Sequence, residues 1–203
     1  MKNSISKFCL LTGMALLIGG CASTGSSYTI RGEKLHDKSL LTNQSTIYLV
    51  NGGDGMRGTY LSAFVGEEPA VGSGAAAVNI EFEQLRHRTS KVILEKTILT
   101  EDKALEIAKM NQSDYLLYSR TEKWTDPLGI NCSKIYLDEA SVLISLYSVA
   151  DKKLLQTSRL TNANCPTKLN GMPLRPGSPE RLFEELFTNW LENSFVKQHA
   201  RGN

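Results

Sequence analysis

Residues 137–161, LDEASVLISLYSVADKKLLQTSRLT, decide the fold because they encode two strands that pair with each other. Apolar and polar residues alternate over residues 137–149, which is typical of a strand with one buried face. Residues 150–153 form a turn signal, and residues 154–161 read as the returning strand. The stretch therefore predicts an antiparallel hairpin.

Strand and helix patterns alternate before this hairpin. Residues 46–50, 91–97 and 114–124 are runs rich in β-branched and aromatic residues, and they predict strands. Residues 74–88 carry apolar residues at helical spacing, and Thr100 is placed to begin a second helix. These segments predict a β-α-β-α-β order ahead of the hairpin.

The last segment of the domain predicts a long amphipathic helix. Ser178-Pro179-Glu180 is a favourable helix start, because it offers a cap, a proline in the first turn and an acid near the positive end of the helix. A broad apolar stripe follows, formed by Leu182, Phe183, Leu186, Phe187, Trp190, Leu191 and Phe195. A stripe of this width is typical of a helix packed on a core, and a groove for a partner is the alternative.

Together these elements predict one α/β (α+β) domain over residues 46–198. The order βαβαβββα implies a single mixed β-sheet with helices packed on it, in which the first strands pair in parallel through right-handed crossovers. A length of 203 residues and a hydrophobic content of 41% fit one globular domain, and they exclude a disordered chain or a multi-span membrane protein.

The N-terminal segment has the pattern of a targeting signal. Lys2 and Lys7 precede an apolar run over residues 8–18, which is too short to span a bilayer comfortably. The run ends in LIGGC at residues 17–21, which resembles the signal of bacterial lipoproteins. The resemblance implies removal of residues 1–20 as a signal peptide, and acylation of Cys21 with fatty acids such as palmitate. A membrane-spanning anchor and an ordinary signal peptide are the alternatives.

The resemblance also implies a location in the cell envelope. Ala22 follows the cysteine in place of the Asp that retains many lipoproteins in the inner membrane, so the outer membrane is favoured, with the mature chain facing the periplasm. Residues 21–45 are polar, and we interpret them as a tether with a flexible reach of about 25 Å. Loss of Lys2 and Lys7 reduces 23 basic side chains to 21, equal to the 21 acidic ones, so nucleic acid is not an expected partner.

Two cysteines remain in the body of the mature chain. Cys132 and Cys165 form an even pair in an oxidising compartment, and we predict a disulfide between them that would contribute roughly 4 kcal/mol. Two free thiols or a metal-binding pair are the alternatives. Neither cysteine has the spacing of a structural zinc site.

Part of the domain resembles a known family. The run DYLLY at residues 114–118, the extension that follows it and residues 142–155 resemble a family of uncharacterised proteobacterial lipoproteins, catalogued as a domain of unknown function. The element order also resembles small periplasmic α/β modules, such as the lipoprotein activators of peptidoglycan synthases. These resemblances imply an envelope role and transfer no catalytic residues.

No motif in the sequence predicts a cofactor or a metal. Residues 53–58, GDGMRG, match the spacing of a dinucleotide-binding loop, but no convincing helix follows and no acid lies about 20 residues on. We interpret this run as a mobile turn. His36, His87 and His199 are scattered and lack metal-ligand spacing.

The sequence predicts a non-enzymatic binding or accessory module. Asp138 and Glu139 are adjacent, so they should lie on opposite faces of a strand and cannot act together as acid and base. Cys132 with His87 is a candidate nucleophile pair, which leaves a periplasmic hydrolase with a cysteine or carboxylate site as the alternative function.

Two features are candidate contacts with another envelope protein or a glycan. Arg86, His87, Arg88 and Lys91 form a local basic cluster that could touch an acidic glycan or phosphate, and a solvated helix end is the plainer interpretation. Trp124 would be a contact hot spot if exposed, and the alternative is that it folds onto the domain. The membrane, through a lipid on Cys21, is the other expected partner.

Overall fold

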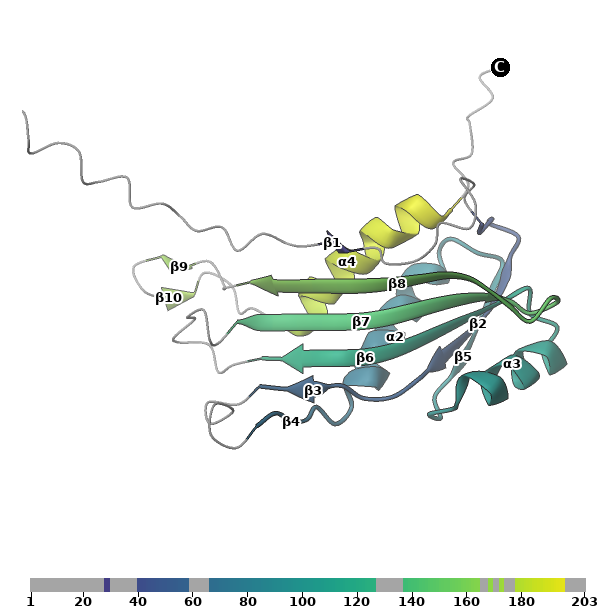
Figure 1. Ribbon diagram of the computed structural model, residues 1–203. Helices are drawn as coiled ribbons and strands as arrows, with labels where there is room; N and C mark the ends of the chain where they lie inside the picture. The colour runs from purple at the N-terminus through teal and green to yellow at the C-terminus, as the bar shows by residue number, and fades with distance from the viewer. Residues whose placement is uncertain are drawn as a thin grey trace, which may run out of the picture.

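The computed structural model describes residues 28–29, 40–58, 66–126, 137–164, 168–169, 172–173 and 178–195. It confirms the predicted α+β class, because a single mixed sheet is packed against helices (Figure 1). The sheet has eight strands. Six of them follow the order β1 (Tyr28–Thr29), β8 (Lys153–Asn164), β7 (Asp138–Ser148), β6 (Tyr115–Thr125), β2 (Thr46–Asn51) and β5 (Lys91–Glu95), while β3 (Met56–Arg57) pairs with β6, and β4 (Glu68–Pro69) pairs with β3. The eight longest elements follow the predicted order βαβαβββα.

The bounds of the eight longest elements agree with the predicted segments to within a few residues, whereas the sequence analysis did not predict the five two-residue strands. The strands of the main sheet are β1 (Tyr28–Thr29), β2 (Thr46–Asn51), β3 (Met56–Arg57), β4 (Glu68–Pro69), β5 (Lys91–Glu95), β6 (Tyr115–Thr125), β7 (Asp138–Ser148) and β8 (Lys153–Asn164). A separate two-stranded sheet contains β9 (Lys168–Leu169) and β10 (Met172–Pro173). The helices are α2 (Ser73–Leu85), α3 (Glu101–Met110) and α4 (Pro179–Ser194).

The pairing of the strands defines two ends of the sheet. β2 lies between β5 and β6 and runs parallel to both, whereas β6, β7 and β8 pair antiparallel in sequence. The starts of β2, β5 and β6 therefore lie at one end, together with the turn between β7 and β8. We call this the turn end, and we call the opposite end, where β6 finishes and β7 begins, the pocket end.

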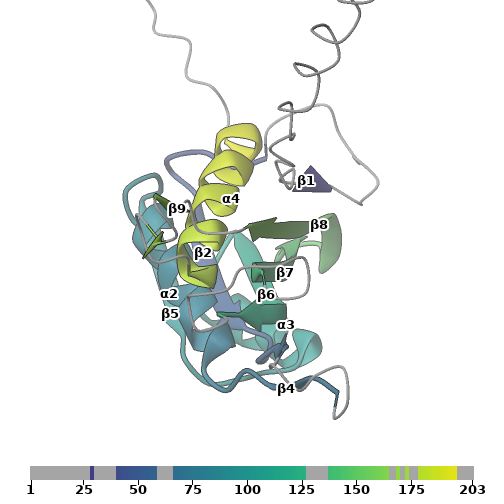
Figure 2. The same ribbon diagram turned by 90° about the vertical axis from the view of Figure 1, so that its left-hand side faces the viewer.

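Helices α2 and α4 cover one face of the sheet, and α3 covers part of the other (Figure 2). The predicted alternation in β7 is confirmed, because Val142, Ile144 and Leu146 are fully buried beneath the helices. The predicted stripe on α4 is also buried, apart from Phe195, which ends the helix. The stripe is therefore core, as its width indicated.

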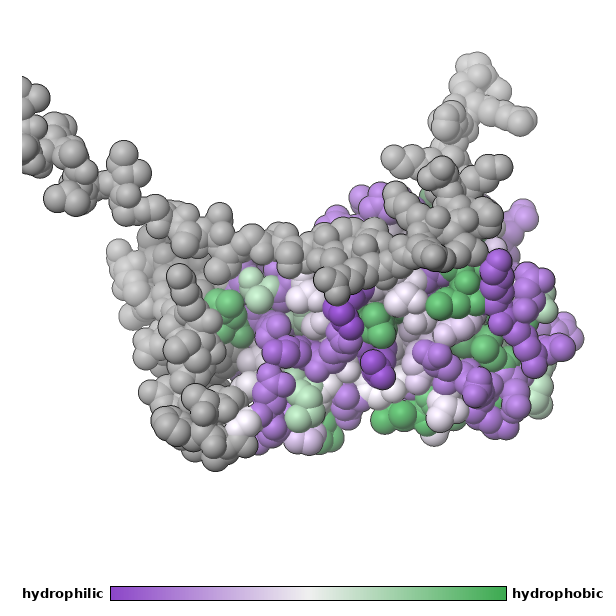
Figure 3. Space-filling model, viewed as in Figure 1, coloured by the Kyte–Doolittle hydropathy of each residue, from purple (hydrophilic) through white to green (hydrophobic). Residues whose placement is uncertain are grey.

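The opposite face of β6, β7 and β8 is mixed in polarity (Figure 3). Arg159 of β8 makes two contacts of 2.7 Å with the Glu122 carboxylate of β6, and Ser141 of β7 donates to the same carboxylate. Among the described helices only α3 packs on this face, near Tyr48 and Tyr147. The sheet therefore has two helices on one face and a second face that α3 covers only in part.

The folded domain begins earlier than residue 46. Leu41 is fully buried and bridges to Phe195, and the backbone amides of Leu40 and Leu41 donate to the carbonyl of Ser194 at 3.1 Å. Strand β1 adds a further pairing at the outer edge of β8. The expected tether over residues 21–45 therefore contains a strand and a core residue. The polar composition of this segment did not predict either feature, because a single buried side chain such as Leu41 is enough to anchor a segment to the core.

Candidate functional site

The glycine-rich loop after β2 is packed between β6 and α2. The amide of Gly52 donates to the carbonyl of Ser119 at 2.7 Å, and the amide of Gly55 donates to the hydroxyl of Ser73 at 2.9 Å. The carbonyl of Gly53 accepts a hydrogen bond from the amide of Thr121 at 3.2 Å. The interpretation of this run as a mobile turn is therefore wrong, because bonds to distant elements hold the loop in place.

Within this loop, Asp54 satisfies the first turn of α2. Its carboxylate accepts hydrogen bonds from the amides of Gly72 at 3.0 Å and Gly74 at 2.8 Å, whereas no side chain at the N-cap position of α2 does so. A Cβ on Gly74 would lie 2.7 Å from the carbonyl oxygen of Gly53, so this position has no room for a side chain. The positive end of α2 is thus occupied by a carboxylate of the chain itself.

Replacing Asp54 by Ala should lower the free energy of unfolding by about 1–2 kcal/mol, because two amides of α2 lose a charged acceptor. Urea denaturation followed by circular dichroism measures the change. The matched control is Asp54→Asn, which keeps one acceptor oxygen and should lose less. An equal loss in both variants, or none in either, would contradict this role of the carboxylate.

A pocket of about 250 Å³ opens at the pocket end, between the first turns of α2 and α4. Its lining includes Arg57, Val71, Ser73, Trp124, Asp126 and Glu180. Val71 stands at its rim with 88% of its surface exposed, which is unusual for a large apolar side chain. The pocket combines apolar surface with carboxylates, so it offers both area and charge to a partner.

Trp124 lies in the wall of this pocket and is only 7% exposed. Its ring packs edge-on against Phe183 of α4 with a centroid distance of 6.0 Å, and its indole nitrogen donates to Glu180 at 3.0 Å. Trp124 therefore folds onto the domain, which is the second of the two interpretations offered by the sequence. With so little of its surface exposed, the ring is not a free contact surface.

Three carboxyl groups from distant segments gather beside Trp124. Burial raises the pKa of Asp138 to about 6, and the nearby Asp126 and Glu180 contribute to this rise. Burial and Glu180 also raise the pKa of Asp126. In the described part of the chain none of the three forms a salt bridge, and Arg57, which lines the same pocket, pairs with Glu68 at 2.8 Å. The described lining of the pocket is therefore acidic.

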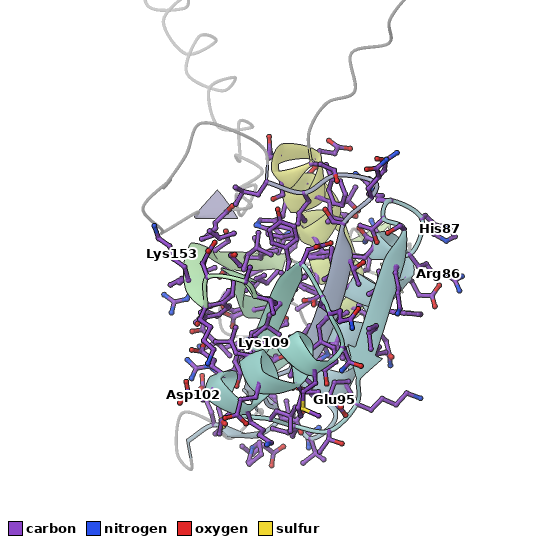
Figure 4. All side chains as sticks on the ribbon, turned by 90° about the vertical axis from the view of Figure 1, so that its right-hand side faces the viewer. Arg86, His87, Glu95, Asp102, Lys109 and Lys153 are labelled. Carbon is purple, nitrogen blue, oxygen red and sulfur yellow. The ribbon has the colours of Figure 1, made fainter. Side chains whose placement is uncertain are left out.

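The other candidate contacts, Arg86 and Arg88, lie far from Trp124. They follow the last turn of α2 at the turn end of the sheet, about 20 Å along the helix from its pocket end. Arg86 is half exposed and pairs with Glu83 at 2.7 Å. Figure 4 shows Arg86 and His87 directed outward into solvent. The structure therefore does not bring Trp124 and the two arginines into one site.

Several predicted site residues cannot be placed. Cys21, Cys132 and Cys165 lie outside the described residues, so lipidation, the disulfide and the pairing of Cys132 with His87 remain predictions. The adjacent Asp138 and Glu139 have different surroundings. Glu139 lies 3.9 Å from Lys123, whereas Asp138 lies near Asp126 and Glu180.

The described residues contain neither a metal-binding cluster nor a membrane-spanning helix. Across these ranges no group of three or more His, Cys, Asp and Glu side chains could hold a metal ion. No helix within them has the length and apolar character needed to cross a bilayer.

Sequence reasoning missed the buried carboxyl group of Glu81. This α2 side chain is fully buried, it accepts a hydrogen bond of 2.5 Å from Ser119, and burial raises its pKa to about 8. Its second oxygen and the hydroxyl of Thr121 have no hydrogen-bond partner in the described structure. The sequence did indicate that Glu81 is buried, because it falls between the apolar Val78 and Leu85 at helical spacing and therefore on the same face of the helix.

Comparison with known proteins finds similarity in structure only. No family model and no curated protein matches the sequence. Among solved structures, the PelC dodecamer from Paraburkholderia phytofirmans matches with a TM-score of 0.59 and 16% identity, over 85% of this chain and 100% of that chain. The chain shares the PelC fold. A variant of PelC in another crystal form gives a TM-score of 0.56 at 14% identity.

More distant solved structures include one protein described as a lipoprotein. Lipoprotein GNA1162 from Neisseria meningitidis matches with a TM-score of 0.42 and 10% identity, over 74% of this chain and 98% of that chain. The C-terminal domain of LpoB from Salmonella enterica gives 0.40 and 11%, over 63% and 88%. At such identities the likeness to PelC establishes the fold and transfers no activity.

Proposed function

We propose that this chain is an outer-membrane lipoprotein, held by a lipid on Cys21, whose periplasmic domain is a non-enzymatic binding or accessory module of the cell envelope. The observation that carries the proposal is LIGGC at residues 17–21, directly after a short apolar run. A folded domain with the PelC fold, beginning near Leu40, supports it. Two or more acyl chains would anchor such a protein stably.

The pocket end is the surface we assign to the partner. The exposed Val71 and the pocket behind it offer apolar area, while Asp126 and Glu180 favour a basic group on the partner. Asp138 adds a third carboxyl group to the same region. The partner is therefore expected to present a basic side chain next to an apolar one. Because PelC is described as a dodecamer, a second copy of this chain is one candidate.

Replacement of Cys21 by Ser should leave residues 1–20 attached and the protein without lipid, because the thiol is the acylated group in the proposed processing. Intact-mass analysis and fractionation of membranes measure both effects. Cys132→Ser is the matched control, since it removes a thiol and leaves the processing signal unchanged. A bare thiol on Cys21 in the unmodified protein would overturn the proposal.

A photo-crosslinking amino acid at position 71 should capture a partner in whole cells, whereas the same amino acid at position 110 should not. Val71 and Met110 are both apolar and 88% and 80% exposed, but Val71 lies at the pocket and Met110 ends α3 toward the turn end. Mass spectrometry of the crosslinked band distinguishes a second copy from another envelope protein. Equal capture from both positions, or none from position 71, would contradict the assignment of this surface.

A further inference from the structure

Strand β1 lies much closer to Cys21 in sequence than the rest of the domain does. Tyr28 follows Cys21 by seven positions, whereas Leu40, where the continuous domain begins, follows it by nineteen. A fully extended chain covers at most about 3.6 Å per residue, so these segments span no more than about 25 Å and about 68 Å. The effective distance between lipid and domain therefore depends on whether β1 is paired.

The structure shows that β1 is paired with the sheet. Tyr28 lies opposite Leu160 and Thr29 lies opposite Arg159, antiparallel along the outer edge of β8. A point within β8 is therefore joined to Cys21 by seven positions, which can span no more than about 25 Å. This is less than half of the roughly 68 Å that the chain from Cys21 to Leu40 could span.

We infer that the β1–β8 edge of the sheet is the surface that faces the lipid bilayer, and that the pairing of β1 holds it there at short range. The inference rests on the proposed lipidation of Cys21. The opposite edge is β5, five strand spacings or about 24 Å from β1. β5 is consequently turned away from the membrane.

The arrangement leaves the pocket free for a partner. Figures 1 and 2 show β1 and β8 on one side of the domain and β4, which precedes the pocket residue Val71, on the opposite side. An anchor that holds the β8 edge against the bilayer therefore directs the β4 side away from the lipid. The two proposed contacts, with membrane and partner, do not compete for the same surface.

The charges beside the β8 edge suit an anionic bilayer. Lys152 and Lys153 are exposed where the chain turns into β8, and neither forms a salt bridge with another described residue. Figure 4 shows Lys153 on the opposite flank of the turn end from Arg86. Lysines near a surface of phosphatidylglycerol are attracted to it within about one Debye length. Pairing of β1 also covers part of an edge strand that would otherwise be open.

Energy transfer to labelled headgroups tests the orientation. The lipidated full-length mature protein is reconstituted into vesicles of phosphatidylethanolamine and phosphatidylglycerol that carry a headgroup acceptor. A donor dye is attached through a genetically encoded azide in place of Lys153 or Lys91. Both are exposed lysines at the turn end, on opposite edges about 19 Å apart across four strand spacings. Transfer from position 153 should be at least twofold greater than from position 91.

Breaking β1 should remove this difference. Combined Tyr28→Pro and Thr29→Pro changes prevent normal strand pairing, so transfer from the two positions should become nearly equal. Thr29→Val is the matched control, because it keeps the backbone amide and strand propensity. If the proline variant fails to fold, the comparison of donors at positions 153 and 91 in the chain with unmodified β1 still tests which edge of the sheet faces the bilayer. Equal transfer from a lipidated, vesicle-bound protein would overturn this inference alone, whereas absence of lipid on Cys21 would overturn the proposed function with it.

Discussion

Replacement of Glu81 by Gln should raise the free energy of unfolding at pH 9 by on the order of 4 kcal/mol. The carboxyl group has a pKa of about 8 in the folded protein, against an ordinary value of 4.5. Between these values the folded state binds a proton that the unfolded state has lost. The stability that Glu81 contributes is therefore full below about pH 4.5, is lost as the pH rises toward 8, and changes little above it. The amide of the E81Q variant stays neutral throughout, so that variant should not show this fall.

Urea denaturation at pH 6, 7.5 and 9 measures the effect. This pH range lies at or above the pKa of about 6 for Asp138, so Asp138 contributes little to the change of the free energy of unfolding with pH. Glu83→Gln is the matched control, because Glu83 lies on the same helix with its side chain 55% exposed and should leave the pH dependence unchanged. An E81Q protein with the same pH dependence as the unmodified chain would show that Glu81 does not titrate in the folded state.

Trp190→Ala should lower the free energy of unfolding by about 3–5 kcal/mol, as expected for truncation of a large core aromatic. The ring is 1% exposed, it stacks on Phe187 at a centroid distance of 5.4 Å, and its nitrogen donates to Ser158 at 3.1 Å. Truncation leaves a cavity between α4 and β8 and removes this donor.

Two comparisons separate these contributions of Trp190. Trp190→Phe keeps a stacked ring and loses the hydrogen bond, so its loss of stability should be roughly 1–2 kcal/mol. Leu154→Ala removes a side chain that is 42% exposed and should change stability by about 0.5 kcal/mol or less. Thermal or urea denaturation of the three variants measures their losses of stability, which should decrease from W190A to W190F to L154A. A loss below about 1 kcal/mol for W190A would contradict the core role of α4.

The elements that could be predicted are those whose pattern is local. The alternation in β7 and the Ser178-Pro179 start of α4 specify face and boundary within a few residues, and both are confirmed; the hydroxyl of Ser178 accepts from the amide of Arg181. Thr100 precedes α3 as predicted, but its side chain makes no capping hydrogen bond. A local pattern thus predicts where a helix or strand lies more accurately than it predicts which side chain caps its end.

The features that could not be predicted depend on contacts between distant segments. Asp54 reaches Gly74 twenty residues later, so a loop that looks unstructured in sequence becomes the cap of α2. The burial of Trp124 depends on Phe183 and Glu180, which belong to a helix that begins more than fifty residues further on. The carboxyl groups beside it come from three separate segments for the same reason. No spacing rule in one stretch of sequence contains this information.

The bridge that joins Leu40 and Leu41 to the end of α4 has a mechanical consequence. If the chain is anchored through Cys21 and bound by a partner at the pocket end, as proposed, a load between the two would act first on β1 and this bridge, and then along β2. That strand is hydrogen-bonded in parallel on both sides, to β5 and β6, so the force would act in shear against two ladders at once. The architecture is suited to transmitting tension along β2 without unravelling from the end that begins at Leu40.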